Sequence, residues 1–170
     1  YCFTRQKNTF LDVEYEELIK LETPKILKET IPLTLETDLP EKKAANIDKS
    51  KPIYIYNAYN LDPEWKKETS ANRILLLEPS HFKEYPMSQK TIDFIIKIAR
   101  ENIPNIQVYV GEFDELINNT RQLNSVYFKE HPLNKNYKGI EEPRDWMFEV
   151  KGYFPSFFAF WKKCKKQLNY

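Results

Sequence analysis

The feature that most constrains the fold is an alternation of strand-like and helical runs along the middle of the chain. Residues 53–56 are β-branched and aromatic, which is typical of a strand. Residues 73–78 form a short continuous apolar run that stops at Pro79, as expected for a strand buried on both faces. Residues 106–110 and 125–128 predict two further strands.

Helical patterns lie between these strands. Ser88 is placed to cap a helix that ends before Pro104, and its apolar positions Ile92, Ile95, Ile96 and Ala99 recur at helical spacing. A shorter helical stretch is expected around residues 113–117. Because parallel neighbours need crossover connections, this order predicts an α/β fold. We expect a Rossmann-like parallel sheet of about four to five strands flanked by helices, over residues 51–170.

The two ends of the chain have a different character. Residues 1–50 contain three prolines and few apolar runs, so we expect an extended linker or docking segment with a short helix near residues 11–21. Residues 155–168 predict a helix with an aromatic stripe and four lysines near its end. That stripe is expected to be core or a domain interface, and its aromatic density makes a docking surface plausible.

Composition excludes several classes of protein. With 26 Lys and Arg against 25 Asp and Glu, the net charge of +1 argues against a dedicated nucleic-acid clamp. Three glycines leave no room for a Gly-rich phosphate loop, and two distant cysteines favour reduced thiols in the cytoplasm. No apolar run is long enough to span a bilayer, and no signal-peptide pattern occurs. Because the first residue is Tyr rather than Met, we expect a fragment of a larger protein.

Polar residues collect where the expected strands end. These stretches are 57–60, 78–81, 111–113 and 129–132. In an open α/β sheet, ligands bind beyond the carboxyl ends of the strands. The sequence therefore predicts a binding rim for a polar small molecule, such as a chromophore or nucleotide, or for a partner domain. The candidate cofactor-binding residues are Glu78, Ser80, His81, Glu112, Glu130 and His131. An equally weighted alternative is that these side chains cap helices and stabilise turns.

No motif for catalysis or metal binding accompanies this rim. The chain lacks G-x-S-x-G, and neither Cys2 nor Cys164 lies in a recognisable catalytic setting. His81 and His131 could approach each other at the rim, but two histidines without further ligand spacing do not favour a metal site. We therefore predict no catalytic residue and no metal ligand.

Three stretches nevertheless resemble bacterial photolyase/cryptochrome-like proteins. They are residues 72–82, 107–112 and 127–132. More narrowly, they are similar to the α/β region that follows the FAD-binding helical domain in a group of these proteins. Residues 152–163 resemble an aromatic helix that packs between domains there, and residues 9–13 resemble the stretch just after the flavin domain.

The resemblance implies light-dependent DNA repair or photoreception, performed by a flavin domain outside this chain. FAD would sit in that domain, DNA would bind through it, and an antenna chromophore could bind in this one. The chain departs from the family's usual order, in which the α/β domain comes first and opens with a W-F-R-R-D-L-R-like strand; no such motif occurs here. Two alternatives remain open. One is a non-catalytic protein-interaction domain, and the other is a stand-alone enzyme that uses Glu78, His81, Glu130 and His131 as acid-base groups.

Overall fold

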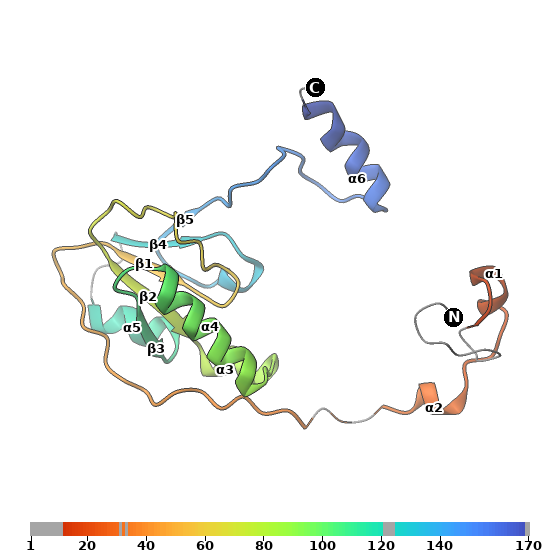
Figure 1. Ribbon diagram of the computed structural model, residues 1–170, viewed down its shortest axis with the longest axis horizontal. Coiled ribbons are helices and arrows are strands. Elements are labelled where there is room, and N and C mark those ends of the chain that lie inside the picture. The colour runs from red at the N-terminus through yellow and green to blue at the C-terminus, as the bar shows by residue number, and fades with distance from the viewer. Residues whose placement is uncertain (1–11, 31, 33, 121–124, 169–170) are drawn as a thin grey trace. The chain divides into compact units, whose positions relative to one another are not determined.

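The expected strands form one parallel sheet in the computed structural model of the chain, which describes residues 12–30, 32, 34–120 and 125–168. Its strands are β1 (Ile53–Tyr56), β2 (Asn72–Leu77), β3 (Gln107–Val110), β4 (Val126–Lys129) and β5 (Ile140–Glu142). Their spatial order is β3-β2-β1-β4-β5, and every pairing is parallel. The predicted Rossmann-like α/β class is therefore confirmed (Figure 1).

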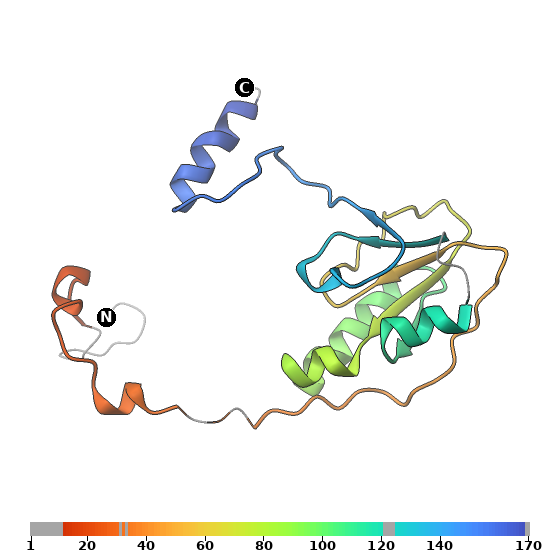
Figure 2. The ribbon, with the colours of Figure 1, turned by 180° about the vertical axis from the view of Figure 1, so that it is seen from behind.

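The helices connect the strands and cover both faces of the sheet (Figure 2). Between β2 and β3 run α3 (Pro79–Glu84) and α4 (Gln89–Asn102), and between β3 and β4 runs α5 (Phe113–Thr120). The chain moves outward from β1 to β3 and then returns across the sheet to β4. Right-handed crossovers that travel in opposite directions place their helices on opposite faces, which is why α4 and α5 are separated by the sheet.

Strand periodicity divides the core into two layers. On the α5 side, Ile53 and Ile55 of β1 pack with Ile74 and Leu76 of β2 and with Phe113. On the α4 side, Leu75 and Leu77 pack with Ile92, Ile95 and Ala99 of α4, while Tyr54 and Tyr56 pack with Trp65. Alternate residues of β1 and β2 thus face opposite layers, and both strands are buried throughout.

The sequence signals for the start and the end of α4 are confirmed by the structure. Ser88 is the N-cap of α4, and its side chain accepts a hydrogen bond from the Thr91 amide at 3.3 Å. The helix ends at Asn102, just before Pro104. The strand β5 was not predicted, because its sequence is short and polar. Gly139 allows it to form: a Cβ there would lie 2.5 Å from the Val126 carbonyl oxygen, and its φ is +143°.

Residues 35–50, expected to be part of an extended linker or docking segment, belong to the compact unit that contains the sheet, residues 35–170. Leu39 packs against the α4 layer, and Ile47 packs against the α5 layer. Thr37 accepts a hydrogen bond from the Met87 amide at 2.7 Å, and the backbone of Asn46 bonds to Gln107 in both directions. The segment is therefore an extended strap, and its individual contacts were not predicted because its few apolar residues have no period.

Residues 1–34 form a separate unit that contains α1 (Tyr15–Leu18) and α2 (Lys25–Lys28). The helix predicted over residues 11–21 is shorter than expected, and Leu11 lies outside the described residues. Glu14 makes no side-chain cap to α1, and Tyr15 and Ile19 are exposed. A helix of one turn that has no side-chain cap and whose apolar residues are exposed gains too little free energy to form further turns.

The C-terminal helix was also predicted too long. It comprises α6 (Phe157–Cys164), followed by a single 3₁₀ turn, η3 (Lys165–Gln167). Ser156 caps α6 by accepting from the Ala159 amide at 3.2 Å. Cys164 is buried, whereas Phe157 and Phe158 are exposed. Within the described part of the chain, no helix is long and apolar enough to cross a membrane.

Candidate functional site: a cavity at the carboxyl ends of the strands

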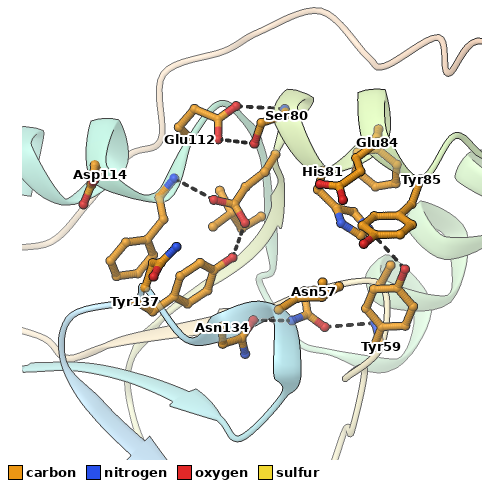
Figure 3. A pocket seen from close by; sticks show the side chains of 17 residues that line it. Asn57, Tyr59, Ser80, His81, Glu84, Tyr85, Glu112, Asp114, Asn134 and Tyr137 are labelled. Carbon is orange, nitrogen blue, oxygen red and sulfur yellow. Dashed lines mark hydrogen bonds between the residues drawn. The ribbon is translucent and has the colours of Figure 1, made fainter.

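A cavity of about 380 Å³ opens at the carboxyl ends of the strands, where the sequence predicted a binding rim (Figure 3). That volume falls within the range of small-molecule pockets. The strand order reverses at β1, which has β2 on one side and β4 on the other. The cavity is lined from the loops after β1, β2, β3 and β4, and therefore includes this switch point.

Four of the six predicted site residues line the cavity, namely Glu78, Ser80, His81 and Glu112. Glu130 and His131 are not among its lining residues. Glu130 instead accepts hydrogen bonds from the Arg144 amide, at 3.0 Å, and from the Trp146 indole. These two donors stabilise the charged form and lower the pKa of the Glu130 carboxyl.

His131 lies just behind the cavity wall. Its Nδ1 accepts from the Leu133 amide at 3.2 Å, and its ring stacks on Tyr59 with a centroid distance of 4.8 Å. Burial lowers the pKa of His131, and the charges of Arg144 and His81 lower it further. It supports a lining residue and does not itself line the cavity.

Glu78 and Glu112 cap each other's helices. Glu112 follows β3, yet its carboxylate accepts from the amide and hydroxyl of Ser80 in α3, at 2.9 and 2.7 Å. Glu78 follows β2, yet its carboxylate accepts from the Phe113 amide at the start of α5, at 3.0 Å. We call this arrangement the reciprocal cap. Both carboxylates therefore satisfy amides that their helices would otherwise leave unpaired.

The second oxygen of Glu78 accepts a hydrogen bond from the Tyr137 hydroxyl, and the Tyr137 ring stacks on Phe113 at 4.1 Å. Burial raises the pKa of Glu78, although the Tyr137 and Phe113 donors oppose the rise. Burial also raises the pKa of Tyr137, and the neighbouring Glu78 charge adds to it. Tyr137 is therefore a permanent hydrogen-bond donor at neutral pH, and it fixes the floor of this side of the cavity.

The other side of the cavity is made of rings. The Tyr59 hydroxyl shares a hydrogen bond with Nε2 of His81 at 3.1 Å, and the His81 ring lies 5.3 Å from that of Tyr85. Burial lowers the pKa of His81 below its usual 6.5, so its imidazole is neutral at pH 7. Tyr59 and Tyr85 are 43% and 48% exposed, which leaves faces open to a ligand. We call Tyr59, His81 and Tyr85 the ring wall.

An amide pair joins the β1 and β4 loops below the ring wall. Asn57 Nδ2 donates to Asn134 Oδ1 at 3.2 Å, and Asn134 Nδ2 donates to the Lys129 carbonyl at 2.8 Å. Asn57 also accepts from the Tyr59 amide at 2.9 Å, which positions Tyr59 on its loop. Both amides line the cavity, so this pair forms its wall at the switch point.

Sequence reasoning missed the ring-wall residues Tyr59 and Tyr85, as well as Tyr137 and Asn134. Tyr59 could have been found, because it lies in the loop after β1 that was already recognised as part of the rim. Tyr137 lies well beyond the end of β4, and only folding of the β4–β5 connection brings it to Glu78. Among the described residues, no group of three or more His, Cys, Asp or Glu could hold a metal ion.

Comparison of the chain with protein-family models, with curated proteins and with solved structures finds no match. The geometry of the cavity is therefore the basis for inferring a function.

Proposed function

We propose that residues 35–170 form a binding module that holds a small heteroaromatic molecule in the rim cavity without transforming it. The observation that carries this proposal is the ring wall beside a cavity of about 380 Å³ at the carboxyl ends of parallel strands. Tyrosine and imidazole faces stack on planar rings, and the carboxylate, amide and phenol groups opposite them can bond to ring substituents.

The engagement of the polar groups argues for binding rather than catalysis. The Glu78 and Glu112 carboxylates are held in the reciprocal cap, and Nε2 of His81 is bonded to Tyr59. Of the four acid-base residues considered for an enzyme, Glu130 and His131 do not line the cavity. A general base must lie within reach of its substrate, so this set is a poor catalytic constellation.

Binding can be tested with three ring compounds, adenosine, riboflavin and thiamine, titrated into the full chain by calorimetry with amide chemical-shift mapping. We expect saturable binding by at least one of them, with shifts centred on residues 57–60 and 78–85. Tyr59→Ala should weaken that binding by about tenfold, which corresponds to the loss of one stacking contact.

Tyr153→Ala is the matched control, since Tyr153 is 91% exposed and does not line the cavity. It should leave the affinity unchanged. The proposal is wrong if none of the three compounds binds, or if Tyr59→Ala and Tyr153→Ala have the same affinity as the parent chain.

The photolyase/cryptochrome-like resemblance supplies a second candidate, which stays a prediction. Under it, this module adjoins an FAD-binding helical domain, and the rim cavity would hold an antenna chromophore. The ring wall favours this candidate over a pure protein-interaction domain, because it can stack on a planar ligand. Absorbance of the purified full-length protein tests it: a protein that stays colourless after FAD is added would contradict it.

A further inference from the structure

The acidic side chains that line the rim cavity are not balanced by any Lys or Arg in the described lining. Of its 17 described lining residues, four carry carboxyl groups and none is Lys or Arg. Besides the two carboxylates of the reciprocal cap, these are Glu84 and Asp114, both exposed. Lys138 lies 4.0 Å from Asp114, but both side chains are about two-thirds exposed, at 67% and 71%, so water and salt screen the pair. His81 adds no positive charge at neutral pH, because burial lowers its pKa.

At the start of both α3 and α5, one amide that could bind a phosphate already donates to a carboxylate of the protein. In such folds a phosphate accepts from free amides at the start of a helix beyond a strand. In α3, position 79 is a proline without an N–H, and the Ser80 amide donates to Glu112. In α5, the Phe113 amide donates to Glu78. To reach either of these two amides, a phosphate would have to displace a carboxylate of the protein and then remain beside it.

From these two observations we infer that the rim cavity selects neutral or cationic ring compounds and rejects their phosphate esters. The ligand class is a heterocycle with hydrogen-bond donors, such as a nucleoside or an amine-bearing ring, and not a nucleotide or dinucleotide. The protein thus has the sheet topology of a nucleotide-binding fold, while its own carboxylates occupy the position of the phosphate. This inference rests on the proposed function.

Matched pairs of ligands provide the test: adenosine with AMP, riboflavin with FMN, and thiamine with thiamine monophosphate. Each is titrated into the full chain by calorimetry at low and high NaCl. We expect the unphosphorylated member to bind at least about tenfold more tightly at low salt, equivalent to about 1.4 kcal/mol. The difference should shrink at high salt, because screening weakens the repulsion between phosphate and carboxylates.

A charge reversal separates electrostatic rejection from simple lack of space. Glu84→Lys places a cation at the last position of α3, where a positive charge suits the helix. It should reduce the preference for adenosine over AMP by about threefold or more, because it replaces a repulsive charge with an attractive one. Glu68→Lys is the control, since Glu68 is exposed and does not line the cavity; it should leave the preference unchanged.

The outcomes distinguish the two proposals. If AMP, FMN or thiamine monophosphate binds as tightly as its partner, the charge selection is wrong and the binding module stands. If the preference is insensitive to both salt and Glu84→Lys, the rejection is steric and the inference is again overturned. If no member of any pair binds, the proposed function itself fails.

Discussion

The two halves of the cavity use similar polar residues in different ways. At the ends of β2 and β3, Glu78 and Glu112 are fixed in the reciprocal cap, and each joins the end of one strand to the helix that follows the other. At the ends of β1 and β4, an amide pair joins the loops, and Tyr59 stands above it with 43% of its surface exposed. The polar groups of the first half are engaged in holding two helices, whereas the Tyr59 ring in the second half remains partly exposed.

This difference shows that a polar residue at a strand end is not by itself a ligand-binding residue. A buried acceptor that already satisfies two protein donors gains nothing from a ligand unless those donors find new partners. An exposed ring loses only water when a ligand covers it, and gains stacking contact. The comparison therefore predicts that changes in the reciprocal cap alter stability, whereas changes in the ring wall alter binding.

The largest effect is expected for Glu78→Ala. It leaves the Phe113 amide and the Tyr137 hydroxyl without their acceptor in a largely buried setting. We expect the free energy of unfolding to fall by about 2–4 kcal/mol, as for two unsatisfied donors. Urea denaturation measures it, and Glu78→Gln, which keeps a carbonyl acceptor, is the control and should recover at least half of the loss. A loss of stability below about 0.5 kcal/mol would contradict a stabilising role for Glu78 in the fold.

A smaller effect is expected for Glu112→Ala. It removes the acceptor for the Ser80 amide and hydroxyl, but Ser80 is exposed and water can replace the carboxylate. We expect a loss of about 1 kcal/mol, typical of a helix cap. Thermal and urea unfolding should rank it between Glu78→Ala and the parent chain. A loss equal to that of Glu78→Ala would show that burial does not set the strength of the two caps.

Tyr59→Ala should change stability least among these substitutions. Its stacking on His131 and its bond to His81 are both at the surface, so we expect a loss of about 0.5–1 kcal/mol while ligand binding falls about tenfold. Urea denaturation measures the change in stability, and calorimetry on the same preparation measures the change in ligand affinity. A large loss of stability without a loss of affinity would contradict the proposed role of the ring wall in binding.

The smallest effect is expected for the pH dependence of stability, because burial and hydrogen bonds act in opposite directions on the pKa of Glu78. Burial raises the pKa of Glu78 in the folded protein above its usual 4.5. The difference in the free energy of unfolding between the parent chain and Glu78→Gln should therefore favour the parent most below pH 4.5. This difference should decrease as the pH rises through the pKa of Glu78 in the folded protein. Urea denaturation of both proteins from about pH 4 to pH 7 tests the sign. An advantage that grows with pH would show that the donors outweigh burial.

Much of the sheet followed from local signals in the sequence. The apolar run before Pro79 and the β-branched run at residues 53–56 predicted β2 and β1, because buried parallel strands need continuous apolar residues. Ser88 predicted the start of α4, since a hydroxyl at that position satisfies a free amide. The contacts of the strap and the position of β5 could not be predicted, because both depend on residues that lie far away in sequence, such as Gln107 with Asn46.

For the site, the order of strands along the chain was enough to predict which residues would gather at one edge of the sheet. Parallel strands place all their carboxyl ends together, so Glu78, Ser80, His81 and Glu112 were bound to meet there once the strands were recognised. The contacts of each of these side chains depend on the folded structure. Hydrogen bonds between loops that are distant in sequence make Glu78 and Glu112 helix caps. They also join Tyr137 to Glu78 and Glu130 to Arg144. Tyr59, by contrast, stays partly exposed. Side-chain direction and burial depend on those long-range partners, and no local pattern encodes them.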